Sequence, residues 1–300
     1  MCVQSQPNSI QQLWRPLCPF RLDLGVFAML TGYIDESYTG ESEPVTFGLN
    51  CVYATYQSWF WIESGWNKVI EAKNKQLEKA GRKPVRRYHS KEISNFENEF
   101  KDWDDTERAE FTNSLLVHGI NGNFIQSVGL IANLKEIATD WPKVKRDGVM
   151  RFGYSAMLRM IMRKIELMIP AQFGPGARII LINERCSFDG VLLKAFNHHL
   201  NERPNAAKLF ASISPMGWED CIPLQPADFL AYEAMKEAHR YRTDGTPRKR
   251  RKSLTAFLGL EPVGAVCDEI PRAAILKWKE EFEVLDRKRG MNLDDFTVRG

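Results

Sequence analysis

Apolar and polar residues follow two different periods along the chain, and each period predicts a set of secondary-structure elements. Residues 29–35 form a mostly apolar run, and in 45–53 every second residue is apolar. These two segments predict an antiparallel hairpin, because side chains alternate between the two faces of a strand. Further strands are expected at 124–133, 178–184 and 208–214. The centre of 178–184 is an unbroken apolar run, which is typical of a strand covered on both faces.

Between these strands, apolar residues recur every three to four positions and predict helices. These helices are expected at 62–77, 105–117, 154–168, 188–200, 226–241 and 271–287. Pro170 is expected to end the third of them, because proline cannot donate the next helical hydrogen bond. Strands that alternate with helices need parallel crossovers, so the pattern predicts an α/β fold with a mixed sheet flanked by helices.

The same pattern divides the chain into three parts. Residues 1–28 follow neither period and are expected to be a poorly ordered N-terminal extension, so Met29 is an alternative start to Met1. Residues 29–242 are predicted to form the folded domain, with a helical insertion at about 58–120 after the second strand. Residues 243–300 are expected to be a basic linker and a C-terminal helix.

Composition excludes several classes of protein. Hydrophobic residues make up 44% and charged residues 26% of the 300 residues, which excludes wholesale disorder, collagen-like chains and disulfide scaffolds. No run of about 18 apolar residues is present, so no membrane span is expected. The six cysteines include no C-x-x-C pair, which is typical of reduced thiols and predicts a cytoplasmic protein. The net charge of +3 is too small to imply a polyanionic partner by itself.

Four carboxylates at the ends of predicted elements are candidates for chemistry. Asp35 ends the first strand, and Asp228 lies in the first turn of a late helix. Glu184 ends the buried strand, at the edge where open α/β sheets bind ligands. Neighbouring side chains of a strand alternate in direction, so either Asn183 or Glu184 faces a pocket there, and Asp189 is a further candidate. Each acid alone is equally typical of a solvated strand end or a helix N-terminus.

Three motifs give the chain a resemblance to a known family. They are Tyr33-Ile-Asp-Glu-Ser37 on the first strand, His89-x-x-Glu92 in the insertion and Gln225-x-Ala-Asp228 at the start of the late helix. An acid at the end of a later buried strand accompanies them. Over roughly residues 29–242 the chain therefore resembles the domain of unknown function 3800 family, whose members look like ribonuclease H-like proteins. The resemblance implies a ribonuclease H-like mixed sheet and a nuclease site with Mg²⁺ or Mn²⁺ as the cofactor.

The resemblance also implies roles for individual residues. Asp35, Glu184 and Asp228 would hold the metal ions, Glu92 would assist as a ligand or as the base that orients water, and His89 would orient groups or shuttle protons. Hard divalent cations prefer carboxylate oxygens, and two such ions can clamp the attacking and leaving oxygens of a phosphodiester. The chain departs from the ribonuclease H pattern at Glu184, where aspartate is more usual. Either Glu184 takes over, Asp189 contributes instead, or the enzyme is impaired.

Two basic clusters flank these motifs and predict nucleic acid as the partner. One cluster precedes the His89 motif, and the other follows the helix that carries Asp228. The predicted nucleic-acid contacts are Arg82, Lys83, Arg86, Arg87, Lys91, Arg248, Lys249, Arg250, Arg251 and Lys252. Positive charge beside acids is what phosphate-backbone binding followed by metal-assisted cleavage requires. Two solvated basic loops are the alternative, above all for 248–252.

The sequence thus predicts a metal-dependent nuclease that hydrolyses phosphodiester bonds of DNA or RNA through a two-metal carboxylate site. One alternative is a non-catalytic nucleic-acid-binding or interaction protein that retains the fold, and stabilisation by Mn²⁺ would separate the two. Another alternative is a different two-metal phosphoester reaction, such as strand transfer, which product analysis would identify. DNA or RNA, endo- or exonuclease action and the oligomeric state stay open.

Overall fold

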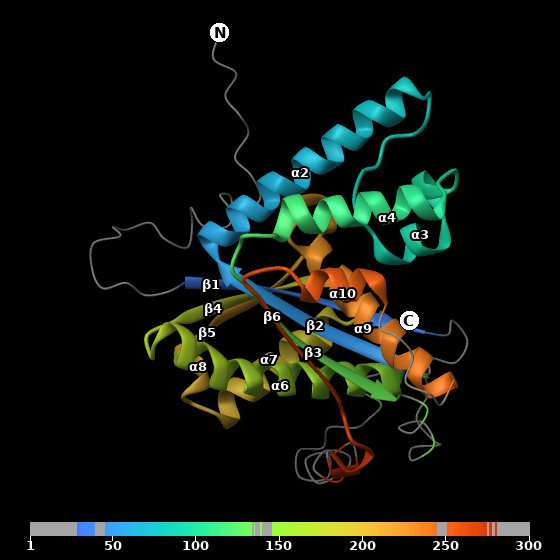
Figure 1. Cartoon of the computed structure of the whole chain (residues 1–300). Coiled ribbons are helices and arrows are strands. Elements are labelled where there is room, and N and C mark those ends of the chain that lie inside the picture. The colour runs from blue at the N-terminus through green and yellow to red at the C-terminus, as the bar shows by residue number, and fades with distance from the viewer. Residues whose placement is uncertain are drawn as a thin grey trace, which may run out of the picture.

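A six-stranded mixed sheet with the strand order β5-β4-β1-β2-β3-β6 forms the centre of the molecule (Figure 1). The structure is a computed structural model, and it describes residues 29–39, 46–133, 135, 139, 146–244, 251–274, 276–277 and 280. The strands are β1 (Met29–Tyr38), β2 (Thr46–Thr55), β3 (Ile125–Asn133), β4 (Arg178–Glu184), β5 (Phe210–Met216) and β6 (Val263–Glu269). β1, β2 and β3 are antiparallel neighbours, whereas β4 and β5 run parallel to β1, and β6 runs parallel to β3. The predicted mixed α/β sheet and its first hairpin are confirmed.

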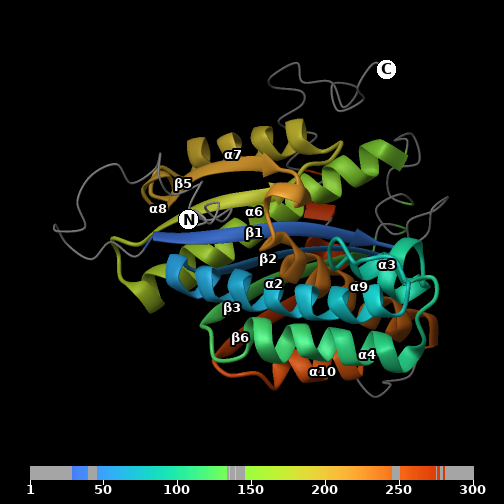
Figure 2. The same cartoon turned by 90° about the horizontal axis from the view of Figure 1, so that it is seen from above.

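Helices lie on both faces of the sheet, which gives three layers (Figures 1 and 2). One face is covered by α6 (Arg146–Phe173), α7 (Asp189–Glu202) and α8 (Ala206–Leu209). On the other side lie α2 (Tyr56–Lys79), α3 (Ser90–Asn95), α4 (Asp105–Ser114), α9 (Leu224–Asp244) and α10 (Lys252–Leu258). Shorter helical segments are η1 (Asn98–Phe100), the π-helix η2 (Leu115–Ile120) and η3 (Trp218–Asp220). The segment from α2 to η2 separates β2 from β3, as the predicted helical insertion requires.

Alternation along the strands sends apolar side chains into two separate cores. On β1, Ile34 joins the cluster under α6 and α7, while Tyr33 joins the cluster under α2 and α9. On β4, Leu181 joins the cluster under α6 and α7, and Ile182 joins the cluster under α2 and α9. The prediction that this strand is covered on both faces is therefore confirmed.

Helix α9 lies close against the sheet because β2 carries a glycine under it. A Cβ atom at Gly48 would lie 3.2 Å from Met235 Cβ and 3.3 Å from the carbonyl oxygen of Ala231, so a larger residue would press on the helix. Ala227 and Leu230 of α9 are buried in the core on this side of the sheet. This packing fixes the first turn of α9 and the direction of its polar side chains.

Pro170 does not end its helix, contrary to the prediction. Helix α6 continues to Phe173 and stops at Gly174, whose φ is 87° and whose N–H donates to the Pro170 carbonyl at 3.0 Å. A proline removes one helical hydrogen bond and leaves the others in place. Ile169 and Phe173 pack in the core on either side of the proline, and their burial holds the last turn.

Two elements, α10 and β6, lie in the segment that the sequence predicts as a basic linker. Residues 243–300 therefore supply a helix and the sixth strand, and are not simply a linker before a final helix. The residues of β6 are exposed or half-buried, so this edge strand lacks the apolar alternation by which strands are recognised. The expected extension at 1–28 and most of the expected helix at 271–287 lie outside the described residues.

Candidate active site

Three carboxylates from three different elements lie near one another toward the carboxyl ends of β1 and β4. Asp35 does not end its strand as predicted, because β1 continues to Tyr38. Asp35 belongs to β1, Glu184 to β4 and Asp228 to the first turns of α9. The register pairs Ile34 with Asn183, so the next residues, Asp35 and Glu184, are neighbours on parallel strands and point to the same face. That face is the one covered by α9. The sequence left open whether Asn183 or Glu184 faces the pocket, and the register shows that Glu184 faces the other acids and Asn183 does not.

Burial and mutual repulsion make this cluster unfavourable for negative charge. Asp35 is 5% exposed and Asp228 is 8% exposed. Burial raises the pKa of Asp35 well above its usual value, and the charges of Asp228, Glu36 and Glu184 raise it further. Burial also raises the pKa of Asp228 to about 6, against the opposing effects of the His89 charge and a backbone hydrogen bond. A cation beside these carboxylates would relieve both effects.

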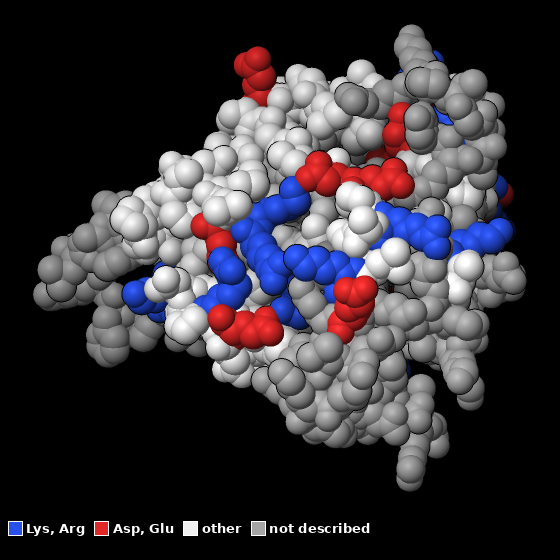
Figure 3. Space-filling model, turned by 90° about the horizontal axis from the view of Figure 1, so that it is seen from below, with Lys and Arg blue, Asp and Glu red and all other residues white. Residues whose placement is uncertain are grey.

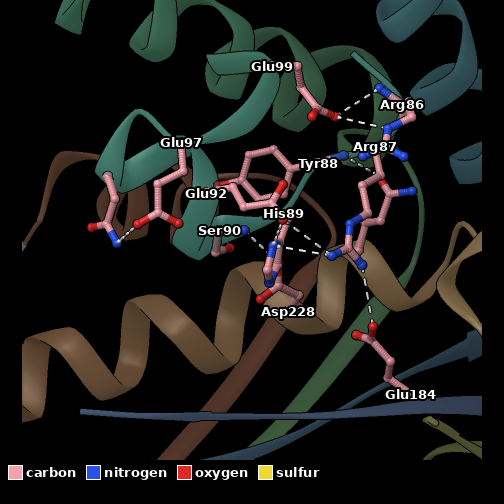
Figure 4. Close-up of polar contacts among 12 residues, drawn as sticks. Arg86, Arg87, Tyr88, His89, Ser90, Glu92, Glu97, Glu99, Glu184 and Asp228 are labelled. Atoms are coloured by element: carbon pink, nitrogen blue, oxygen red, sulfur yellow. Dashed lines mark hydrogen bonds and ion pairs between the residues drawn. The ribbon is translucent and has the colours of Figure 1, made fainter. Parts of the chain in front are cut away.

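The Gln225-x-Ala-Asp228 motif joins the segment before α3 to the start of α9. Gln225 Oε1 accepts hydrogen bonds from the Tyr88 backbone N–H and the Trp66 indole N–H, each at 2.8 Å. Asp228 Oδ2 accepts a hydrogen bond from the Ser90 N–H at 2.7 Å (Figure 4). The sequence does not reveal the role of Gln225, because its backbone partner lies 137 residues away and leaves no local pattern.

The guanidinium of Arg87 lies beside the acids and supplies their counter-charge (Figure 4). Its Nη1 is 3.4 Å from Glu184 Oε1, and its Nη2 is 3.7 Å from Glu92 Oε1. The same Nη2 is 3.3 Å from His89 Nδ1, which is 3.0 Å from Glu92 Oε1. The sequence predicts Arg87 as a nucleic-acid contact, whereas its ion pairs in the structure are with carboxylates. Glu92 is joined to Glu184 through this arginine.

The donor chemistry is of the kind that a hard divalent cation prefers, although the side chains do not stand in a metal-binding arrangement. In the part of the chain that the structure describes, no three His, Cys, Asp or Glu side chains are placed to hold a metal ion. Two of the four expected ligands, Glu184 and Glu92, are engaged by Arg87. Asp35 and Asp228 offer buried oxygen donors that repel each other. The type of donor, and not the spacing of the side chains, is therefore what matches Mg²⁺ or Mn²⁺.

Asn183 and Asp189 belong to a separate cluster on the other face of the sheet. Asn183 Nδ2 donates to Asp189 Oδ1 at 3.0 Å, and that oxygen also accepts from the Cys186 N–H at 3.2 Å. Asp189 therefore fixes the turn before α7, and Glu184 is the acid that joins the candidate site. Glu36 also points to this second face, where its Oε2 accepts a hydrogen bond from the Tyr154 hydroxyl at 3.2 Å.

The predicted nucleic-acid contacts divide into paired, exposed and undescribed residues. Arg82 makes hydrogen bonds of 3.0 and 2.9 Å with Glu107. Arg251 makes hydrogen bonds of 2.6 and 3.1 Å with Glu233, a residue that is 3% exposed. Both arginines therefore pair with carboxylates away from the three acids of the candidate site. Lys83, Arg86, Lys91 and Lys252 are exposed, while Arg248, Lys249 and Arg250 lie outside the described residues.

A further group of basic side chains lies on the outer face of α6 and α7 (Figure 3). Three ion pairs neutralise part of this charge, namely Arg159–Glu202, Lys164–Asp268 and Arg203–Glu166. Helices α6 and α7 cover the face of the sheet opposite to α9, so this basic surface is separated from the three carboxylates by the sheet. It has no part in the candidate site.

Comparison with known proteins gives no match, either among models of protein families or among curated proteins. Within the described ranges, no helix combines the length and the apolar character needed to cross a bilayer. The function therefore has to be argued from the three carboxylates, their neighbours and the sheet that carries them.

Proposed function

We propose that the chain is a Mg²⁺- or Mn²⁺-dependent nuclease with a ribonuclease H-like core, similar to the domain of unknown function 3800 family. The observation that carries this proposal is the convergence of Asp35, Glu184 and Asp228 at one sheet edge, with raised pKa values for the two aspartates. Strongly perturbed carboxylates at such an edge are typical of functional sites. An antiparallel β1-β2-β3 unit with β4 and β5 parallel to β1 is consistent with the proposed core.

In this proposal Asp35, Glu184 and Asp228 hold the divalent cations. The chemistry that bound cations would supply there is activation of a water molecule as the nucleophile and neutralisation of charge on the leaving oxygen of a DNA or RNA phosphodiester. The Ser90 N–H binds one oxygen of Asp228 and so orients that carboxylate. His89, whose charge acts on Asp228 and whose side chain is 27% exposed, is placed to move a proton between the site and solvent.

Arg87 and Glu92 have a second role in this proposal. Glu184 contacts Arg87 through Oε1, so its second carboxylate oxygen could bind a cation while this contact is kept. A guanidinium has five N–H donors, so those of Arg87 that do not face Glu184 and Glu92 are available for a phosphate oxygen. Glu92, 3.7 Å from Arg87 Nη2, holds the arginine at the site.

Cleavage assays with matched variants test the proposal. Labelled single- and double-stranded DNA and RNA would be incubated with the full chain and Mn²⁺, Mg²⁺ or EDTA. We expect cleavage only with a metal, and we expect Asp35→Asn and Asp228→Asn to reduce it by about 100-fold or more while the thermal melts stay cooperative. Asp189→Asn is the matched control, because this acid begins α7 just after β4 and lies on the other face of the sheet. Undiminished cleavage by an Asp35→Asn, Asp228→Asn double variant would refute the assignment.

A second candidate function is a nucleic-acid-binding protein without catalysis. The ion pairs of Arg87 with Glu184 and Glu92 favour it, because they neutralise the acids without any metal. A protein of this kind would bind nucleic acid equally well in Mn²⁺ and EDTA and would gain no thermal stability from Mn²⁺. The nuclease should gain stability, since a cation that binds the folded state alone shifts unfolding to higher temperature.

A further inference from the structure

Trp218 lies directly beside the candidate site. It opens η3, two residues after Met216, and Met216 is the β5 partner of Glu184 in the sheet. The chain continues this pairing past the strand, where the Arg185 N–H donates to the Met216 carbonyl at 2.8 Å. The guanidinium carbon of Arg87 is 4.3 Å from the centre of the Trp218 ring. Arg87 therefore touches the indole on one side and Glu184 on another.

The packing of the fold does not account for a tryptophan at this position. Trp59 and Trp66 are fully buried, and their indole N–H groups donate to Thr31 O and to Gln225, each at 2.8 Å. Trp218 is half-buried, and it does not belong to the apolar clusters that the described residues form. A large flat side chain that keeps an exposed part at the edge of a site is suited to stacking on a ligand.

Two arginines surround this indole and are suited to a phosphate. The guanidinium carbon of Arg86 is 6.0 Å from the ring centre, and its side chain is 69% exposed. Its guanidinium is 3.8 Å from Glu99, whose side chain is 6% exposed and also accepts a hydrogen bond from the Arg86 backbone N–H at 3.3 Å. Glu99 therefore keeps a hydrogen bond when the Arg86 side chain turns to a ligand. Lys83, three residues before Arg86, is also exposed. An aromatic ring flanked by cations is the usual composition of a subsite for a nucleotide.

We propose that Trp218, Arg86 and Arg87 form a subsite for an unpaired nucleotide of single-stranded DNA or RNA, next to the phosphate at the three carboxylates. The base stacks on Trp218, and the two guanidinium groups bind the adjoining phosphates. The inference rests on the proposed function, and it names the class of substrate. In a duplex both faces of a base are already stacked, so the subsite selects single strands or unpaired ends over intact duplex.

Binding without catalysis tests this subsite. The full chain would be titrated in EDTA, where no metal-dependent cleavage occurs, into labelled single-stranded DNA, single-stranded RNA and duplex DNA, with fluorescence anisotropy as the readout. We expect Trp218→Ala to weaken single-strand binding about 5- to 150-fold, the range for loss of one base–aromatic stack, and to change duplex binding little. Trp218→Phe keeps a stacking ring and should restore most of the affinity. The DNA and RNA arms show which of the two strands the subsite takes.

Trp61 is the matched control, because its side chain is 53% exposed and it lies on α2, outside the proposed subsite. Trp61→Ala should leave single-strand binding unchanged. The inference is overturned if Trp218→Ala binds single strands as tightly as the wild type, or if Trp218→Ala and Trp218→Phe lose single-strand and duplex binding to the same extent. Its failure is distinct from failure of the nuclease, since cleavage that depends on Asp35 could persist without this subsite. Conversely, single-strand binding that depends on Trp218 would support the subsite even in a protein that cleaves nothing.

Discussion

Arg87 is the residue whose replacement tests the candidate site most directly. Its Nη1 lies 3.4 Å from Glu184 Oε1, and the two side chains are 15% and 27% exposed. At an effective dielectric constant of about 20, two unit charges at that distance attract each other by roughly 5 kcal/mol. Desolvation offsets part of this attraction, and both side chains keep contact with water. We therefore expect Arg87→Gln to destabilise the metal-free protein by about 2 kcal/mol.

The same replacement should strengthen Mn²⁺ binding. At the proposed metal site, a cation would compete with the positive charge of Arg87 beside Glu184 in the wild-type protein, whereas Arg87→Gln has no positive charge there. If about 2 kcal/mol of competition is removed, the Kd for Mn²⁺ falls about 30-fold. Arg87→Lys retains the charge and is the matched control, so its Kd should stay close to that of the wild type.

Isothermal titration calorimetry with Mn²⁺, in the absence of nucleic acid, measures this effect. Thermal melts with and without Mn²⁺ should show that the cation restores the stability lost in Arg87→Gln. Equal Mn²⁺ affinity in wild type and Arg87→Gln would refute the competition between the arginine and the metal. Failure of both proteins to bind Mn²⁺ would refute the metal site itself.

Three further predictions concern stability. The pKa of Asp228 is raised to about 6, so the folded state binds the proton of this carboxyl more tightly than the unfolded state does. The resulting stabilisation is present below about pH 4 and is lost as the pH rises to about 6. Asp228→Asn should remove this pH dependence from thermal melts of the metal-free protein. Arg251→Ala removes the positive charge beside the buried carboxylate of Glu233 and leaves it the hydrogen bond from the Ser253 hydroxyl, so it should cost about 3 kcal/mol in denaturant unfolding. The exposed Lys252→Ala should cost less than about 0.5 kcal/mol. Gly48→Ala presses on α9 and should cost about 1–3 kcal/mol in the same assay, with a loss of the proposed cleavage because Asp228 shifts with the helix.

Much of the sheet can be predicted from the sequence because most strands carry a local signal. The alternation in 45–53 and the apolar run in 178–184 correspond to β2 and β4, and both strands are buried along most of their length. β6 carries no such signal, because its side chains are exposed or half-buried. Its place is set by pairing with β3, and this long-range contact cannot be recognised from β6 alone.

The candidate site was only partly predictable for the same reason. Motifs in the sequence locate Asp35 and Asp228, but the choice between Asn183 and Glu184 depends on the register of β4 against β1. A run of basic residues around Arg87 indicates a solvated or phosphate-binding surface when it is considered alone. Its contacts with acids from α3 and β4 exist only in the folded chain.

The contacts that hold the candidate site together do not require a cation. Gln225 and Asp228 bind the backbone of 88–90, and Arg87 supplies positive charge beside Glu184. A structural zinc site differs, because there the metal itself supplies much of the folding free energy. Removal of divalent cations with EDTA should therefore leave the protein folded, with a thermal midpoint equal to that of protein never exposed to metal, while it abolishes the proposed cleavage. Unfolding in EDTA would contradict this reasoning, because it would mean that a metal is needed for folding as well as for cleavage.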